Sequence, residues 1–358
     1  MRKPRKVGLV LSGGGAKGAY QVGVLKALVE RDIPVHVVSG ASIGALNAAV
    51  IASSPNLAEG VRRLEHIWRE LAHNAPLQHS PPNYLRLLVA LGLQGGLLLT
   101  HLNSLVVLAH QLNIGISTSV MGYASGEGIF SEAPLKALLD QYIDDKALMQ
   151  GMPLYVSVFR QQHTLFSLAQ TLLAEFNLSE SRPSEFMHLQ AVKSPEERKQ
   201  FLMASAAIPV VFAPQTINDT RYVDGGLGGW RKSQGNTPID PLLQQQCDLV
   251  IVTHLSDGSL WSQHDFPDTT LIEVRPQTLI ARNTGLGGGI KDLLDFGASQ
   301  VDSWIAQGYQ DTHSCLASLQ QVSHARQQLQ LSQAALAKSE ANNLAADTVL
   351  ANALARLS

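Results

Sequence analysis

The sequence predicts an α/β domain with a mostly parallel sheet, and three observations favour it. An apolar run at residues 6–12 leads through a glycine-rich turn into a helical pattern. A second run, rich in valine at residues 35–38, also leads into a helical pattern. Further apolar runs at residues 249–255 and 271–275 supply more buried strands. Strands that alternate with helices are typical of parallel sheets.

The first strand ends in a loop where Gly13, Gly15 and Gly18 match the pattern G-x-G-x-x-G. Dinucleotide-binding folds use this pattern, but they place an acidic residue at the end of the second strand. Here the nearest acid, Asp32, precedes that strand. The phosphate loop of nucleoside triphosphatases is not matched either, because Gly18 rather than Ser or Thr follows Lys17.

The second strand ends in the pentapeptide GASIG at residues 40–44, which has the pattern of a nucleophile elbow. This sharp strand-to-helix turn would lift the Ser42 hydroxyl out of the backbone. Gly40 and Gly44 suit it, because a Cβ beside the serine would clash in so tight a turn. A glycine-lined helix N-terminus with a capping serine would give the same pattern without catalysis.

The glycine loop and the elbow would lie side by side if the first two strands are neighbours in the sheet. Both would then lie at the carboxyl edge of the sheet, where open α/β folds bind ligands. Backbone N–H groups of a glycine loop beside a helix N-terminus favour negative charge. An oxyanion hole for a serine nucleophile needs the same property.

The first candidate base for Ser42 is a histidine. A Ser-His-Asp triad in α/β-hydrolase order would draw its acid and its histidine from these residues: Asp240 or Asp257, and His254, His264 or His313. Among these, His254 and Asp257 are the best placed, at the end of a predicted strand. That fold has several strands before its elbow, however, whereas this chain has room for one.

The second candidate base is Asp224, in the sequence Asp224-Gly225-Gly226 after a strand-like run at residues 220–223. Gly225 and Gly226 would let the backbone pass close to another element. A carboxylate there could take the serine proton directly and make a two-residue dyad. The non-catalytic interpretation is an ordinary turn aspartate.

Three motifs in this order resemble the signature of the patatin-like phospholipases, including bacterial members. They are GGGAKG at residues 13–18, GASIG at residues 40–44 and DGG at residues 224–226. The stretches ASAAIPVVF at 204–212, LDF at 294–296 and GYQD at 308–311 also resemble that family. The resemblance spans residues 6–312.

The resemblance implies a three-layer α/β/α fold and a serine lipid acyl hydrolase with no metal ion or other cofactor. Ser42 would form an acyl-enzyme, and Asp224 would act as base for the serine and then for water. Its substrate would be a phospholipid or lysophospholipid, reached through transient contact with a membrane surface. Two alternatives stay open: a Ser-His-Asp esterase for small soluble esters, and a non-catalytic binder of lipid or nucleotide.

The resemblance also assigns roles in the glycine loop. The N–H groups around Gly13, Gly14 and Gly15 would form the oxyanion hole. Lys17 stands where many members of the family place arginine; lysine keeps the charge but loses the planar fork. We expect Lys17 to contact a substrate anion or to hold the loop, although an exposed lysine at a helix start explains it equally well.

The domain organisation predicted for the 358 residues is a catalytic domain at 6–312 and a helical tail at 313–358. Helical patterns at 56–73 and 130–150 and a strand at 155–159 belong to the domain. An apolar helical insertion at residues 84–116 would form core helices, a lid or acyl channel, or a bilayer-docking surface. Two or three helices in the tail would pack on the core, mediate homo-oligomerisation, or bind a regulator or membrane.

Composition narrows the class of protein. Apolar residues make up 45% of the chain and charged residues 16%, and the net charge of −2 argues against a nucleic-acid partner. Cys247 and Cys315 lack metal-ligand spacing and are expected to be reduced thiols. The basic residues before the first strand resemble a signal peptide, but cleavage would delete that strand. We therefore expect a cytoplasmic or peripheral membrane protein, with export as a secretion-system effector left open.

Overall fold

The computed structural model describes residues 6–74, 133–161, 184–207, 213–227, 234–255, 261–280 and 296–355. Internal contacts divide the chain into two compact units, residues 1–312 and residues 313–358. The insertion expected at residues 84–116 lies outside the described residues, and so does Asp257.

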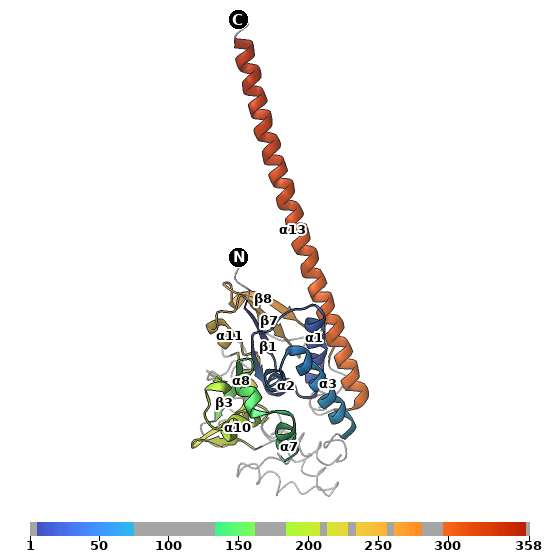
Figure 1. The fold of residues 1–358 in the computed structure, drawn as a ribbon, viewed down its shortest axis with the longest axis vertical. Coiled ribbons are helices and arrows are strands. Elements are labelled where there is room, and N and C mark those ends of the chain that lie inside the picture. The colour runs from blue at the N-terminus through green and yellow to red at the C-terminus, as the bar shows by residue number, and fades with distance from the viewer. Residues whose placement is uncertain are drawn as a thin grey trace, which may run out of the picture. The chain divides into compact units, whose positions relative to one another are not determined.

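A mixed sheet of eight strands forms the centre of the first unit (Figure 1). Its main path has the order β5-β6-β3-β2-β1-β7-β8, and β4 also pairs with β3. The contiguous strands β3, β2, β1, β7 and β8 run parallel to one another, whereas β4, β5 and β6 pair antiparallel. The strand bounds are β1 (Val7–Leu11), β2 (Val37–Ala41), β3 (Leu154–Gln161), β4 (Glu185–His188), β5 (Gln215–Ile217), β6 (Thr220–Asp224), β7 (Leu249–Thr253) and β8 (Thr270–Val274). The mostly parallel sheet is confirmed.

Helices lie on both faces of this sheet, which confirms the three-layer α/β/α fold (Figure 1). On one face, α2 packs against β1, β2 and β3; on the other, α11 packs against β2. The helix bounds are α1 (Ala19–Glu30), α2 (Ile43–Ala52), α3 (Leu57–Asn74), α7 (Ala133–Tyr142), α8 (Asp145–Gln150), α10 (Pro195–Ser205), α11 (Asp240–Gln244) and α13 (Ala298–Ala355). Short 3-10 turns occupy Gly15–Gly18, Leu189–Ala191, Gly225–Leu227 and Gln263–Asp265.

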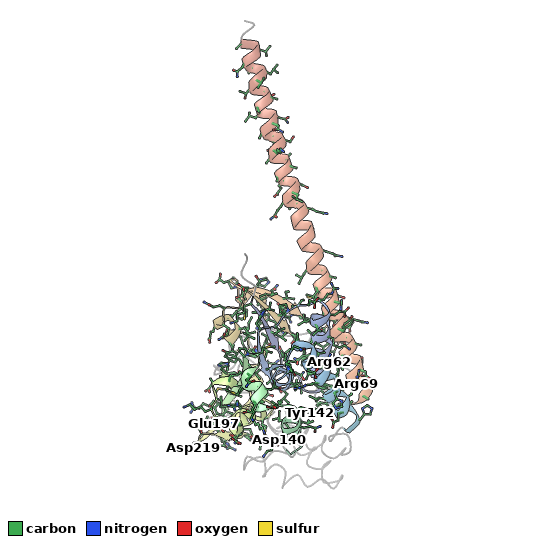
Figure 2. The ribbon with its side chains drawn as sticks, viewed as in Figure 1. Arg62, Arg69, Asp140, Tyr142, Glu197 and Asp219 are labelled. Atoms are coloured by element: carbon green, nitrogen blue, oxygen red, sulfur yellow. The ribbon has the colours of Figure 1, made fainter. Side chains whose placement is uncertain are left out.

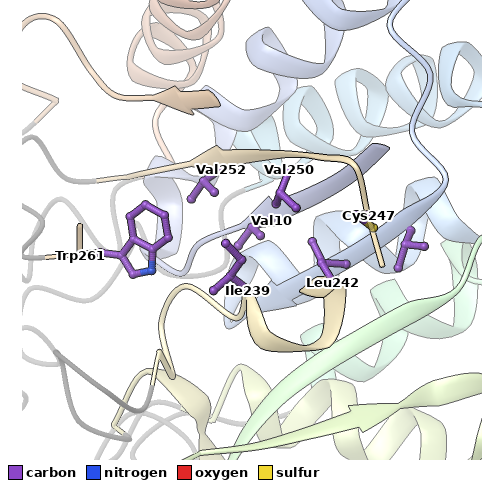
Figure 3. Close-up of a cluster of buried hydrophobic side chains, with 8 residues drawn as sticks. Val10, Ile239, Leu242, Cys247, Val250, Val252 and Trp261 are labelled. Atoms are coloured by element: carbon purple, nitrogen blue, oxygen red, sulfur yellow. The ribbon is translucent and has the colours of Figure 1, made fainter. Parts of the chain in front are cut away.

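Figure 3 shows the core between the sheet and α11. Valines from three adjacent parallel strands meet Ile239 and Leu242 there, and Trp261 closes one end of the cluster. Cys247 is a free thiol in this cluster, and burial raises its pKa. Because these strands are covered on both faces, they read as continuous apolar runs in the sequence rather than as an alternating pattern.

The segment at residues 130–150 forms two helices instead of one. The chain leaves α7 at Tyr142, and Asp144 then caps α8 by accepting hydrogen bonds from the N–H groups of Lys146 and Ala147. An aspartate side chain that bonds its own downstream backbone favours a helix start, so it interrupts a continuous helical pattern.

The carboxyl-terminal tail forms one helix instead of the two or three expected. Helix α13 runs without a break from Ala298 to Ala355, because no glycine or proline follows Gly308. Its first turns pack on α1 so closely that a Cβ at Gly23 or Gly308 would collide with the facing backbone. In the second unit, the described side chains from residue 328 onward are exposed, including six leucines.

Among the described helices, none has the length and apolarity together that crossing a bilayer requires.

Candidate active site

Ser42 occupies the turn between β2 and α2 in a backbone conformation rare for side-chain-bearing residues. Its φ is 52° and its ψ is −128°, so the turn holds it under strain. Its carbonyl accepts the N–H groups of Ala45 and Leu46 and so starts α2. The side chain is 5% exposed. This is the geometry of a nucleophile elbow.

The two flanking glycines are required by close backbone contacts. A Cβ at Gly40 would lie 2.5 Å from the carbonyl oxygen of Gly44. A Cβ at Gly44 would collide with the carbonyl of Leu11 at the end of β1. The elbow therefore closes onto the neighbouring strand, and the glycine loop that follows β1 lies beside Ser42.

The sheet register brings Asp224 to Ser42. Val156 pairs with Gly40 of β2 and with Met187 of β4, while Val158 pairs with Glu185 of β4 and with Asp224 of β6. A strand residue has one partner at each edge, so β2 and β6 share the same edge of β3. Strands β2 and β6 run in opposite directions along that edge, so their carboxyl ends lie next to each other.

The Ser42 hydroxyl lies close enough to the Asp224 carboxylate to favour its charged form. The Gly226 N–H donates to Asp224 Oδ1 at 2.8 Å. Asp224 is 7% exposed, and no charged side chain acts on its carboxylate there. Burial raises the pKa of Asp224 to about 6, although Ser42 and the Gly226 N–H act in the opposite direction.

Gly225 explains how the chain turns beside this pair. A Cβ at Gly225 would lie 2.5 Å from the Ser157 carbonyl oxygen on β3. The carbonyl of Gly225 accepts the buried Ser184 hydroxyl at 2.7 Å. The glycine that follows the aspartate thus lets β6 end in direct contact with β3.

The glycine loop contacts Ser42 through Gly13. A Cβ at Gly13 would lie 3.0 Å from Ser42 Cβ, so the loop and the elbow are in contact. The Gly13 N–H already donates to the Asn236 carbonyl at 3.3 Å. Within the described part of the chain, no acceptor is recorded for the N–H groups of Gly14 and Gly15. Gly15 has φ of 58°, which favours glycine.

Asn236 is a site residue that sequence reasoning missed. Its backbone carbonyl holds the Gly13 N–H, and its Nδ2 lies 3.5 Å from the Gly13 carbonyl. Its Oδ1 would lie 3.1 Å from a Cβ at Gly226. The side chain is exposed, so it stands between the glycine loop and the Asp224 turn. A single asparagine in a polar stretch of the sequence gives no signal for this position.

The segment around Asn236 ties three strands together at the same edge. The hydroxyls of Ser12 and Thr237 lie 3.0 Å apart. The Ser39 hydroxyl donates to the Pro238 carbonyl, and the Ser157 hydroxyl donates to the Gly235 carbonyl at 2.7 Å. Residues following β1, within β2 and within β3 therefore all bind this one segment.

Of the remaining candidates, Lys17 lies half-buried in the 3-10 turn of the glycine loop. His254 is buried behind β7, where its Nε2 lies 3.3 Å from Glu273 Oε2. Burial lowers the pKa of His254 below its usual value. His264 lies exposed in the Gln263–Asp265 turn, and Asp240 begins α11.

An apolar cavity of about 50 Å³ lies behind the elbow helix, between α2, α3 and α7. It begins at Ile43, directly after Ser42, and Trp68 and Tyr142 form part of its wall. Over the described ranges, no group of three or more histidine, cysteine or acidic side chains is arranged to hold a metal ion.

The strained Ser42 turn and the buried Asp224 carboxylate thus lie beside each other on one edge of β3, in a mostly parallel α/β sheet. The chain belongs to the patatin-like phospholipase family, whose family model matches residues 9–243.

Several curated proteins share short, highly similar stretches with the chain. Lysophospholipase nte1 of Aspergillus terreus is 60% identical over 48 residues, which are 13% of this chain and 3% of that protein. Neuropathy target esterase sws of Drosophila melanogaster is 55% identical over 51 residues, or 14% and 4%. A patatin-like phospholipase domain-containing protein of Caenorhabditis elegans is 43% identical over 81 residues, or 19% and 6%. The matches thus span a small fraction of these longer relatives.

Two solved structures are also similar. VipD from Legionella pneumophila aligns with a TM-score of 0.41 and 17% identity, over 88% of this chain and 67% of that chain. The type III effector protein ExoU aligns with a TM-score of 0.36 and 18% identity, over 88% and 53%.

Proposed function

We propose that the protein is a serine lipid acyl hydrolase of the phospholipase A or lysophospholipase type, acting through Ser42 and Asp224. The observation that carries this proposal is the strained Ser42 elbow beside the buried Asp224 carboxylate, whose pKa burial raises to about 6. Such a carboxylate is ionised near neutral pH and is basic enough to accept a proton. Membership of a phospholipase family supports an ester of a membrane lipid as the substrate.

In the first half of the reaction, Asp224 takes the Ser42 proton as the serine oxygen attacks the ester carbonyl. The negative charge that develops on the carbonyl oxygen would be held by the N–H groups of Gly14 and Gly15. The N–H groups at the start of α2 add a favourable helix-end potential. The carbon–oxygen bond to the leaving alcohol then breaks, the alcohol takes the proton from Asp224, and Ser42 keeps the acyl group.

In the second half, Asp224 takes a proton from water, which attacks the acyl-enzyme. The serine oxygen leaves and recovers that proton, and the fatty acid is released. The Gly226 N–H keeps the carboxylate oriented through both halves. Neither half uses a metal ion or a redox cofactor.

A histidine base is the second candidate, and the contacts of His254 argue against it. That imidazole faces Glu273 across the β7–β8 pair, whereas Asp224 is the carboxylate on which Ser42 acts. Asp224→Asn decides between the two, because a triad enzyme would retain activity after this change.

Fatty-acid release from mixed phospholipid vesicles, without added metal, tests the proposal. We expect release by the wild type and none above background by Ser42→Ala or Asp224→Asn. A fluorophosphonate probe should label the wild type and leave Ser42→Ala unlabelled. A folded wild type that neither releases fatty acid nor reacts with the probe would refute a serine hydrolase and favour a lipid-binding protein.

A further inference from the structure

The end of helix α10 contacts the backbone of both members of the Ser42–Asp224 pair. Ser205 is the last residue of α10, and its Oγ accepts the Ser42 N–H at 2.9 Å. Two residues later, the Ala207 carbonyl accepts the Asp224 N–H at 3.1 Å. Ser205 is completely buried and Ala207 nearly so. One short segment therefore fixes the main chain on either side of the reacting atoms.

The Ser42 N–H needs this partner because of the strained turn. At φ of 52° the residue belongs neither to the β2 ladder nor to the α2 helix, so its N–H has no acceptor from regular structure. A buried N–H without an acceptor costs free energy comparable to a lost hydrogen bond. Ser205 supplies the acceptor, and the bond opposes rotation of Ser42 back to a relaxed conformation.

The Ser205 hydroxyl is itself held in place. It donates to the Ser157 carbonyl on β3 at 2.7 Å, so its lone pairs are directed at Ser42. A small hydroxyl side chain can donate to one backbone group and accept from another, which alanine cannot do. The chain from β3 through Ser205 to Ser42 thus sets the nucleophile relative to the strand whose edge carries both β2 and β6.

Helix α10 is well anchored for this role. Buried Arg198 pairs with Asp145 of α8 through two bonds of 2.5 and 2.7 Å. Lys199 pairs with Asp140 of α7 at 2.6 Å, and Glu197 accepts the Asn218 amide at 3.3 Å. Figure 2 labels Asp140 and Glu197 on this part of the surface. The helix therefore has fixed contacts on several sides before it reaches the site.

We propose that Ser205 is a positioning residue for the Ser42 nucleophile and that, with the Ala207 carbonyl, it sets the separation of nucleophile and base. This inference rests on the proposed hydrolase function. The stretch at residues 204–212 resembles the family signature, but the sequence alone assigns Ser205 no role. The hydrogen bonds made by the first four residues of this stretch indicate one.

Ser205→Ala tests the proposal, with Ser53→Ala as the matched control. Ser53 is also a buried serine, and it donates to the Val50 carbonyl at the opposite end of α2, away from the site. The measurements are kcat and KM for a soluble p-nitrophenyl acyl ester and the rate of fluorophosphonate labelling at Ser42. Circular dichroism and thermal unfolding establish that each variant is folded.

Misplacing a reacting group by about 1 Å can lower a rate on the order of 100-fold. For Ser205→Ala we expect kcat and the labelling rate to fall about 10- to 100-fold, with KM changed less than about threefold. Ser53→Ala should keep both rates within about twofold of the wild type. Ser205→Cys, which is close in size and accepts hydrogen bonds weakly, should fall between the serine and alanine forms. It replaces Ser205→Ala in the comparison if the alanine variant does not fold.

A folded Ser205→Ala or Ser205→Cys variant with wild-type kcat and labelling rate would overturn the positioning role while leaving the hydrolase intact. An equal loss in Ser53→Ala would also overturn it, since the effect would then be a general one of removing a buried serine. A wild type without hydrolysis and without labelling would instead overturn the proposed function, and this inference with it.

Discussion

Asp224 lies next to the Ser42 hydroxyl, and Glu273 lies next to the His254 imidazole. These two carboxylates differ in the charges that surround them. The groups that act on Asp224 are the Ser42 hydroxyl and the Gly226 N–H, both neutral, and burial raises its pKa to about 6. Burial also acts to raise the pKa of Glu273, but His254 and the Arg275 guanidinium outweigh it and leave that pKa below its ordinary value.

This difference is the one expected between a general base, the role proposed for Asp224, and a carboxylate in a structural ion pair. Arg275 bonds Glu273 at 2.5 and 2.6 Å and also reaches the Trp261 carbonyl. A carboxylate stabilised in this way has little tendency to take a proton. Asp224 is desolvated without such a partner, and perturbed groups of this kind concentrate at functional sites.

The comparison is tested most strongly by neutralising each carboxylate in turn. Asp224→Asn should lower kcat for lipid ester hydrolysis by about 10²–10⁴-fold, because general-base catalysis typically contributes that much. Glu273→Gln should leave kcat within about threefold in a folded protein. Fatty-acid release measures both, and comparable losses in the two variants would remove the distinction between the carboxylates.

The pH dependence of activity gives the next largest effect. Asp224 must be ionised to accept the serine proton, so kcat/KM should rise about tenfold per pH unit below pH 6 and level off above it. Because Glu273→Gln changes a group that takes no part in proton transfer, it should leave this profile in place. A profile that is flat from pH 5 to pH 8 would contradict a base with this pKa.

Stability gives the smallest effect, and its sign is opposite for the two residues. The pKa of Asp224 lies above its unfolded value of 3.8, so the stability linked to its protonated form is present below pH 4 and lost as pH rises through 6. At pH 7 ionised Asp224 therefore costs up to about 3 kcal/mol, and Asp224→Asn should raise the free energy of unfolding. Glu273→Gln should lower it by about 1–3 kcal/mol, because Arg275 loses its charged partner. Urea unfolding at pH 5 and pH 7 measures both, and a destabilised Asp224→Asn would contradict the expected sign.

The elbow turn and the strands beside it can be predicted from the sequence, because they depend on residues that are close together in the chain. Glycines at positions 40 and 44 around Ser42 define a turn that only small residues permit, and apolar runs define the strands on either side. That β2 and β6 share one edge of β3 does not follow, because it depends on strand pairings between residues 116 and 66 positions apart, Gly40 with Val156 and Val158 with Asp224. For the same reason, sequence reasoning gave no role to Asn236 or Ser205.

His254 shows the converse limit. A histidine at the end of a buried strand has the same appearance in sequence whether it faces a serine or an ion pair. The register of β7 with β8 places Glu273 opposite Val252, two residues before His254, and this pairing decides the environment of the imidazole. The number of helices in the tail was predicted wrongly for another reason. A helix continues where no glycine or proline interrupts it, and the periodicity of apolar residues does not show where one helix ends and the next begins.

The meeting of β2 and β6 on one edge of β3 also has a consequence for how the protein acquires activity. The first 52 residues contain β1, the glycine loop, β2 and α2, so the nucleophile and its elbow can form from contacts close in the chain. The base arrives only when β6 pairs with β3, and long-range strand pairing is intrinsically slow because loop closure must come first. A newly made chain would thus form the elbow turn before Ser205 and Asp224 reach it, and the proposed hydrolase activity would begin only with the last long-range contacts of folding.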